Sequence, residues 1–536
     1  MKKRMLALLM VLGMTASLLA GCGNSENAGG GTPPTDGADA GDTGDTGDAD
    51  EAGDDEDFDD EEMAEIVVAL MCFAPMDESA TDPVEEAINE LTEANINVHV
   101  DIQWYDASTY GEQVPRMIQA AEKLDLMMYT PVPSASYAGF MNAGQLADIT
   151  SLLDEYGPTI KATLGDYLDA VSMNGAIYGV PNSGAKASAQ QIFMREDILE
   201  QVGMLEAAQN ASTWADVEEI YKAVAEQTDL APVVNSDAEG TTLYPRPFMD
   251  PGESFADAFM YDNLGDGFNL IYADPATNEV KCYYLSDEYK EMIERVCNWY
   301  KEGLIYKDAM TAQDYADTLV KSEVGFSTVR QSEVGSKESS EAMTGFPITL
   351  VKITDGIIST SSCTKFGFAV PVTAKEDAAA IKFLNYMYES SEIENLLTWG
   401  VEGRDWTLNA DGMATYPDGV TAETVAYHTA DFLYGDQFLV TPWEGGATDI
   451  RDQQKAENAA CEISPFMGFS VDPTNLQNEL SQCSMIATQY HPALDSGSST
   501  DWEGDLAKFQ EELKASGIDK ILEEYQAQLD AWLATQ

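Results

Sequence analysis

The spacing of apolar residues after position 63 predicts alternating strands and helices. Residues 66–71 form an apolar run of strand length, and "VHVDIQWY" (98–105) places its apolar side chains on one face of a second strand. A helix is predicted to start at "DPVE" (82–85) and another to cover about 109–124, and "DLMMYTP" (125–131) begins as a third strand. This order predicts a parallel sheet with right-handed crossovers.

The loops that follow these strands are the first candidates for a binding site, because ligands lie beyond the carboxyl ends of parallel strands. Tyr129 ends its strand at this rim. We expect its ring to cover the apolar face of a sugar, whose hydroxyls polar groups would bind. Trp104 shares its strand face with apolar neighbours, so we interpret it as a core residue.

The first 62 residues have the pattern of a leader followed by a spacer. Three basic residues precede an apolar run at 5–20 and small residues follow it, which is typical of a signal peptide over 1–21. Residues 22–62 consist mainly of Gly, Asp, Ala, Thr and Glu, and they cannot bury enough apolar surface to offset the entropy of ordering. We therefore predict a disordered acidic linker there.

Charge and motifs narrow the function classes. The chain has 94 acidic and 28 basic residues, and its net charge of −66 argues against nucleic acid and against anionic ligands held by broad basic patches. The sequence contains no GxSxG, HExxH, GxxxxGK[ST], GxGxxG or CxxC, and its three histidines are scattered. We predict no catalytic residues, no cofactor and no metal site. The six cysteines after Cys22 are interpreted as buried free thiols, with disulfides as the alternative.

The C-terminal stretch carries an apolar stripe at helical spacing that is wide enough to dock on a globular body. Its aromatic residues are therefore interpreted as packing residues. The stripe consists of Ile518, Ile521, Leu522, Tyr525, Leu529 and Trp532.

Several stretches, in this order, resemble family 1 extracellular solute-binding proteins, which are the receptors of ABC importers and include the maltose-binding type. They are "FMNAGQLADIT" (140–150), "MNGAIYGVP" (173–181), "IFMREDIL" (192–199) and "STWADV" (212–217). The segment that starts at "MGFSVDP" (467–473) resembles the C-terminal domain of unknown function of their lipoprotein subgroup. "LAGC" (19–22) resembles a lipobox, in which the cysteine is acylated, so Cys22 is the expected lipidation site; an incidental cysteine is the alternative.

The resemblance implies an α/β fold of the two-lobed, type II periplasmic-binding-protein kind with a helical C-terminal extension. Hinge crossings are expected near 178–184, 365–371 and 400–406, where glycines could absorb changes in backbone dihedrals. The implied division is 63–181 and 366–403 for lobe 1, 182–365 and 404–466 for lobe 2, and 467–536 for the helical region packed on lobe 2.

The resemblance also implies a set of ligand contacts. Asn182 and Ser183 follow the first crossing, where the family places polar sugar contacts, but the glutamate of the maltose receptor is missing there, which argues against maltose. Tyr244 lies in a second-lobe loop of the kind that supplies a stacking ring. Trp443 is expected to stack on ligand, with a buried loop anchor as the alternative, and Trp406 is left open between packing and contact. The full set is Tyr129, Asn182, Ser183, Tyr244, Trp443 and Trp406.

The function that the resemblance implies is capture, without chemical change, of a neutral solute, expected to be an oligosaccharide. The protein would be an extracellular, membrane-anchored substrate-binding protein that passes its ligand to the permease subunits of an ABC importer. Its acyl anchor would hold it to the outer face of the cell membrane. A receptor for a peptide or other small molecule on the same fold and a surface glycan-degrading enzyme are the alternatives.

Overall fold

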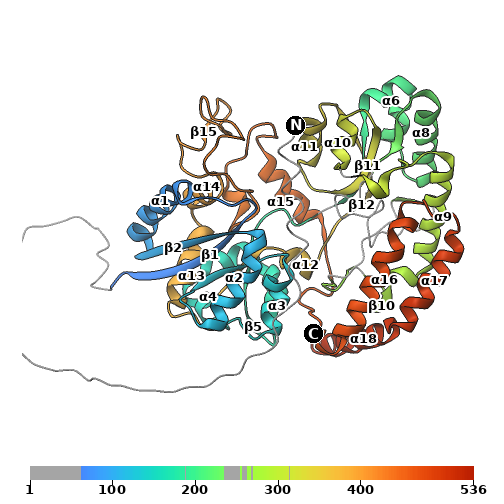
Figure 1. Ribbon diagram of the computed structural model, residues 1–536. Helices are drawn as coiled ribbons and strands as arrows, with labels where there is room; N and C mark the ends of the chain where they lie inside the picture. The colour runs from blue at the N-terminus through green and yellow to red at the C-terminus, as the bar shows by residue number, and fades with distance from the viewer. Residues whose placement is uncertain (1–61, 188, 235–253, 256–261, 267–269, 313) are drawn as a thin grey trace, which may run out of the picture. The chain divides into compact units, whose positions relative to one another are not determined.

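The computed structural model describes residues 62–536 apart from 188, 235–253, 256–261, 267–269 and 313 (Figure 1). The predicted signal peptide, all but the last residue of the predicted linker, and the predicted site residues Cys22 and Tyr244 lie outside the described residues. Within the described part, every helix is too short or too polar to cross a lipid bilayer.

The first sheet has five strands and confirms the predicted parallel arrangement. β1 pairs in parallel with β2 on one side and with β3 on the other, and β14 and β6 extend the sheet by antiparallel pairing. Along β2, Val98, Val100 and Ile102 are buried, as the alternation predicted. In spatial order the strands are β2 (Val98–Asp106), β1 (Ala64–Cys72), β3 (Leu126–Tyr129), β14 (Gly367–Ala369) and β6 (Val180–Pro181).

Two helices connect the parallel strands, and their ends differ from the prediction. α1 (Glu78–Ile96) does not begin at Asp82, because the Asp77 side chain caps it by accepting a hydrogen bond from the Ala80 backbone N–H at 3.3 Å. Pro83 consequently lies inside the helix. α2 (Ala107–Ala120) ends before the predicted position, because the next residue adopts a left-handed conformation with a φ of 51°.

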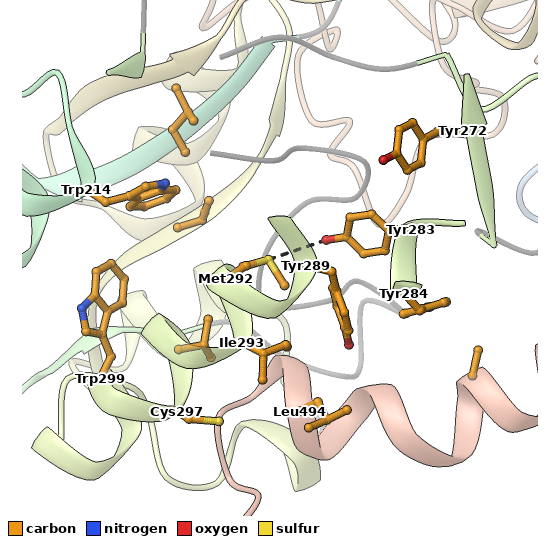
Figure 2. Close-up of a cluster of buried hydrophobic side chains, with 14 of the residues drawn as sticks. Trp214, Tyr272, Tyr283, Tyr284, Tyr289, Met292, Ile293, Cys297, Trp299 and Leu494 are labelled. Atoms are coloured by element: carbon orange, nitrogen blue, oxygen red, sulfur yellow. Dashed lines mark hydrogen bonds between the residues drawn. The ribbon is translucent and has the colours of Figure 1, made fainter. Parts of the chain in front are cut away.

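The second sheet is mostly antiparallel and borders a large aromatic core. β7 pairs antiparallel with β12 and β11, and β8 joins β11 in parallel. Trp214 of α8 (Trp214–Gln227) and Trp299 of α9 (Asp287–Glu302) meet edge to face at 5.8 Å in this core (Figure 2). In spatial order the strands are β12 (Ile348–Thr354), β7 (Ala189–Arg195), β11 (Gly325–Ser332) and β8 (Ala231–Val233).

The C-terminal helices belong to the same core as the second sheet. The Tyr289 hydroxyl of α9 donates a hydrogen bond to Asp495 Oδ1 at 2.7 Å, and Tyr490 stacks on Phe509 at 5.2 Å. The predicted stripe is confirmed, since its residues are buried or half-buried in this core. The helices are α16 (Gln477–Asp495), α17 (Trp502–Ala515) and α18 (Ile518–Leu533).

Two large apolar cores define two lobes in the described chain. The first core contains side chains between Ile66 and Val180, between Phe366 and Leu397, and between Tyr427 and Tyr434. The second contains side chains between Ile192 and Ile353 and between Phe466 and Leu529. The chain therefore passes from one core to the other within 181–191, 354–365 and 435–465.

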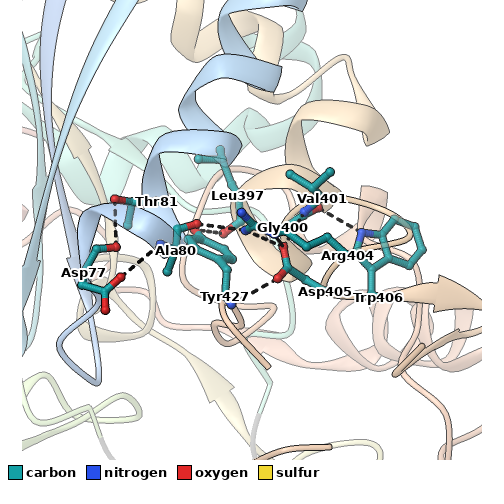
Figure 3. Close-up of polar contacts among 10 residues, drawn as sticks. All are labelled: Asp77, Ala80, Thr81, Leu397, Gly400, Val401, Arg404, Asp405, Trp406 and Tyr427. Atoms are coloured by element: carbon teal, nitrogen blue, oxygen red, sulfur yellow. Dashed lines mark hydrogen bonds and ion pairs between the residues drawn. The ribbon is translucent and has the colours of Figure 1, made fainter. Parts of the chain in front are cut away.

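The third crossing lies later in the chain than predicted. Asp405 is fully buried and accepts a hydrogen bond from the Val401 backbone N–H at 2.9 Å, and Arg404 donates to the Ala80 carbonyl of α1 at 2.9 Å (Figure 3). These contacts hold 400–406 to the first lobe, and Tyr427 lies in its core. The prediction of a hinge at 400–406, and of lobe 2 for 404–434, is therefore wrong.

A short hairpin completes the fold, and the prediction of free thiols is confirmed. The "NADG" segment (409–412) is the turn between β15 (Thr407–Leu408) and β16 (Ala414–Thr415), and Gly412 has a φ of 77°. The six cysteines of the described chain are free, and five of them are buried.

Candidate functional site

Two adjoining cavities form the candidate site. The larger has a volume of about 780 Å³ and lies between α11 (Ser336–Thr344) on one side and the segments 428–432 and 442–446 on the other. The smaller has a volume of about 120 Å³ and is lined mainly by the first two crossing segments. The cavities share the lining residues Glu333, Phe432 and Gln437, so they adjoin.

Three rings of a four-ring aromatic cluster, those of Trp399, His428 and Trp443, line one wall of the larger cavity. Trp443 packs against Trp399, His428 and Tyr416 with ring centroids 4.7–4.8 Å apart. The Trp399 indole is fixed by a hydrogen bond from Nε1 to the Thr441 carbonyl at 2.9 Å. Burial lowers the pKa of His428, so its imidazole is neutral at neutral pH. The wall therefore offers flat, uncharged ring surface.

The short hairpin β15–β16 positions the Trp443 ring of this wall. Ala414 of β16 accepts a hydrogen bond from the Glu444 backbone N–H at 2.8 Å and donates its own to the Pro442 carbonyl at 2.8 Å. The loop that carries Trp443 is thus an added strand-like segment, and its indole is half-buried.

Three phenylalanine rings continue the apolar surface toward the smaller cavity. Phe432 lies 6.0 Å from Phe73 and 5.8 Å from Phe366, measured between ring centroids. Phe73 is 57% exposed and Phe432 43% exposed, which is unusual for such large apolar side chains. Sequence reasoning missed both, although Phe73 directly follows β1 in a loop that is expected at the rim of the sheet.

The wall contributed by the second lobe is polar. Arg330 pairs with Asp317 at 2.9 Å, and the Ser340 hydroxyl donates to the same carboxylate at 3.1 Å. Across the larger cavity, Arg451 pairs with Asp431 at 2.7 Å. These pairs fix charged groups in place, and hydroxyls and carboxylates of α11 stand beside them in the lining. Such groups can bind the hydroxyls of a sugar.

Hydrogen bonds join two crossing segments that line the smaller cavity. The Ser183 N–H donates to the Gly435 carbonyl at 2.8 Å, and the Gln437 N–H donates to the Ser183 carbonyl at 2.9 Å. The Ala185 N–H donates to Gln437 Oε1 at 2.9 Å. The first and third crossings are therefore joined by residues that line the cavity.

Three of the predicted contact residues line the cavities. Asn182 and Ser183 line the smaller one, where Asn182 Nδ2 donates to the Leu433 carbonyl at 2.7 Å. Trp443 lines the larger one. The role of these three residues as ligand contacts stays a prediction.

The structure places two other predicted contacts away from both cavities. Tyr129 is fully buried, because β14 and β6 extend the sheet past β3 and place Gly367 opposite its backbone. Its exposure at the rim was wrongly predicted. Trp406 is only 6% exposed and donates from Nε1 to the Gly400 carbonyl at 3.0 Å (Figure 3). Packing is thus the role that the structure gives Trp406.

Comparisons with known proteins agree with this fold. Residues 86–404, more than half of the chain, match the family model for bacterial extracellular solute-binding proteins, and residues 465–534 match a domain of unknown function, DUF3502. A carbohydrate ABC transporter substrate-binding protein of Streptococcus pneumoniae serotype 4 is 24% identical over 453 residues, which cover 83% of this chain and 87% of the relative.

Solved structures of similar proteins share the two-lobed architecture. The N-glycan transport solute-binding protein of Streptococcus pneumoniae superposes with a TM-score of 0.72 at 21% identity, covering 88% of this chain and 99% of that one. A solute-binding protein of Bifidobacterium longum infantis, described as binding HMO, gives a TM-score of 0.59 at 17% identity over 88% and 99% of the two chains. At these identities the likeness establishes the fold. Together with the family match, it identifies the chain as a member of the bacterial extracellular solute-binding proteins.

Proposed function

We propose that this protein is the substrate-binding component of an ABC importer and captures an oligosaccharide in the cleft formed by the two cavities. The observation that carries the proposal is the pairing of opposite walls in the larger cavity. One wall presents the rings of Trp443 and its neighbours, and the other presents hydroxyl, carboxylate and guanidinium groups. A sugar ring has an apolar face and a polar edge, which these walls match.

The related proteins support a carbohydrate ligand. The pneumococcal relative is named as a carbohydrate ABC transporter protein, and the pneumococcal N-glycan transport protein was solved in complex with Man1GlcNAc and with Man5GlcNAc.

The crossings give a mechanism for capture. The larger cavity is lined by both lobes, since Trp399 ends a helix of the first lobe and α11 belongs to the second. A ligand that contacts both walls stabilises the closed arrangement over an open one, in proportion to the difference in affinity. We expect the backbone of the crossing segments to absorb the movement.

Export and anchoring complete the proposal. The lipobox-like "LAGC" places acyl chains on Cys22, and two or more chains hold a protein stably at a bilayer. The linker after it keeps the lobes clear of the membrane but within reach of the permease subunits. Incorporation of radiolabelled palmitate tests the acylation of Cys22. We expect incorporation in the wild type and its loss in Cys22→Ala; unchanged incorporation in the variant would contradict the anchor.

The test of the proposed function is titration calorimetry of the mature protein against a panel of neutral oligosaccharides. We expect at least one glycan to bind with measurable heat, and Trp443→Ala to weaken its affinity by about 10-fold or more. Trp502→Ala, which removes an indole from α17 outside both cavities, is the matched control and should leave affinity unchanged. If no glycan of the panel gives heat but a bound peptide mixture can be displaced from the protein, the alternative of a peptide receptor would be favoured.

A further inference from the structure

We propose that the smaller cavity is a subsite for an acidic group of the oligosaccharide, a carboxylate or a sulfate ester, held by Lys186 and Lys365. This inference rests on the proposed function and names the chemistry of one end of its ligand. It differs from the uncharged solute that the overall charge favours, because these two lysines line a small cavity and form no broad basic patch.

Two cationic side chains line one small cavity of a strongly acidic protein. Only 28 of the 536 residues are basic, yet two of them line a cavity of about 120 Å³. Among the described residues, neither Lys186 nor Lys365 has a carboxylate within ion-pair distance. Lys186 is half-buried, and its ammonium donates to the Asn182 carbonyl at 2.6 Å, which uses one of its three N–H groups.

The pKa of the Lys186 ammonium reflects how far its surroundings compensate its charge. Burial lowers the pKa of Lys186, and the charge of Lys365 lowers it further, while Cys363, Glu333 and Asp436 act in the opposite direction without cancelling the effect of burial. Its charge is thus incompletely compensated by its surroundings. An anion in the cavity would supply the missing partner and form charge-assisted hydrogen bonds.

A buried neutral side chain lines the cavity together with the lysines. Gln437 is 4% exposed and lines both cavities, and its Oε1 is occupied by the Ala185 N–H. This acceptor of the lining thus already has a donor, and the two lysine ammonium groups supply charged donors to the cavity, which suits a group that only accepts hydrogen bonds.

The acidic groups near this cavity set the limits of its affinity. Glu333 lines both cavities, burial raises the pKa of its carboxyl, and Lys365 lowers that pKa. The Asp436 carboxylate accepts from the Phe438 N–H at 3.0 Å, and Lys455 and Arg451 partly neutralise it. Glu333 is therefore the carboxylate that would repel an incoming anion, and neutralising it should tighten binding.

Titration calorimetry with matched glycans tests the subsite. Each set contains one neutral oligosaccharide, the same chain with a terminal uronic acid, and the same chain with a terminal sulfate ester, at physiological salt to screen the net charge. We expect an acidic member to bind about 10- to 100-fold tighter than its neutral parent. The carboxylate and sulfate arms distinguish the two sources of the acidic group.

Variants then separate the subsite from general electrostatics. The ratio of acidic to neutral affinity should fall at least fivefold in Lys186→Gln and in Lys365→Gln, rise in Glu333→Gln, and stay constant in Lys161→Gln, a surface lysine of the first lobe. Lys365 is exposed, so its substitution keeps the test valid if Lys186→Gln fails to fold.

The outcomes of these titrations distinguish failure of the subsite from failure of the proposed function. Neutral glycans that bind as tightly as their acidic partners overturn the subsite and leave the oligosaccharide receptor standing. The subsite is overturned in the same way if the acidic advantage survives both lysine substitutions. If no member of any set binds, the proposed function itself fails and the subsite with it.

Discussion

Glu394 is a fully buried carboxyl beside the third crossing, and its ionisation should govern how stability depends on pH. Burial raises the pKa of Glu394 well above its usual value, and the nearby charge of Asp436 also raises it. A group whose folded-state pKa exceeds its unfolded value stabilises the fold fully below the unfolded value and loses this contribution as pH rises toward the folded value. Because a glutamine does not ionise, we expect the Glu394→Gln variant to keep this contribution to stability as pH rises.

The measurement is thermal unfolding of Glu394→Gln and wild type between pH 5 and pH 8. The variant should gain stability relative to wild type as pH rises, by about 1.4 kcal/mol for each pKa unit by which burial shifts the group. Glu392→Gln, at an exposed position in the same helix, is the control and should show no such trend. A constant difference between Glu394→Gln and wild type at all pH values would refute the argument.

Ligand affinity should depend on pH through His428, and it should fall as pH is lowered. Its ring lies 4.7 Å from that of Trp443, and burial already lowers the pKa of the imidazole. A ligand that covers this wall removes more water and lowers the pKa further, so it binds the neutral form better. We expect affinity for a neutral glycan to fall between pH 7.5 and pH 5, and His428→Gln to flatten that fall in calorimetry. An equal fall in both proteins would contradict the role of His428.

Single residues show what the sequence could and could not predict about the site. The family resemblance implied Trp443 as a ligand contact, and the structure places it in the cavity wall. Tyr129 failed because its exposure depends on β14, which comes from more than 200 residues later in the chain. Phe73 was overlooked because an apolar residue next to a buried strand looks like core; only the fold leaves it 57% exposed.

At the scale of elements, the loop at 400–406 explains how a glycine can indicate a hinge where there is none. Gly400 has a φ of 84°, and a Cβ on it would lie 2.4 Å from Asp405 Oδ2 and 3.0 Å from the ring of Tyr427. The glycine is therefore required by close packing under the loop. Sequence pattern alone cannot separate these two uses, because both select for glycine.

Two glycine substitutions test this interpretation. Gly400→Ala should cost about 2 kcal/mol or more in urea unfolding, since strain at positive φ adds to the clash with a buried carboxylate. Gly412→Ala is the matched control: its φ is 77°, but a Cβ there meets nothing within 4 Å, so only the smaller strain of about 1 kcal/mol is expected. Equal losses in the two variants would show that packing around Gly400 contributes nothing.

At the scale of the molecule, the two lobes differ in how local their cores are. The alternation in the first 130 residues predicted three strands of the first sheet, because each strand and its crossover helix are adjacent in sequence. The second core draws on segments as distant as α8 and α18. No window of the sequence reports such a contact, so only the family resemblance placed the C-terminal helices on the second lobe.

This shared core predicts that residues 467–536 do not form an independent module. Leu494 is fully buried in the same cluster as Trp214 and Trp299 (Figure 2). Leu529 is also fully buried in this cluster. A chain that ends at 466 would expose the facing side of α9 to water and should lose the near-ultraviolet dichroism of its second-lobe tryptophans.

Because truncation can cause aggregation, a point variant measures how much the C-terminal helices stabilise the fold. Leu529→Ala should lower the free energy of unfolding by about 2–5 kcal/mol in urea, whereas Thr535→Ala, at an exposed position, should not change it. A truncated protein with native dichroism, together with an unchanged Leu529→Ala midpoint, would mean that the second lobe is stable without its C-terminal helices.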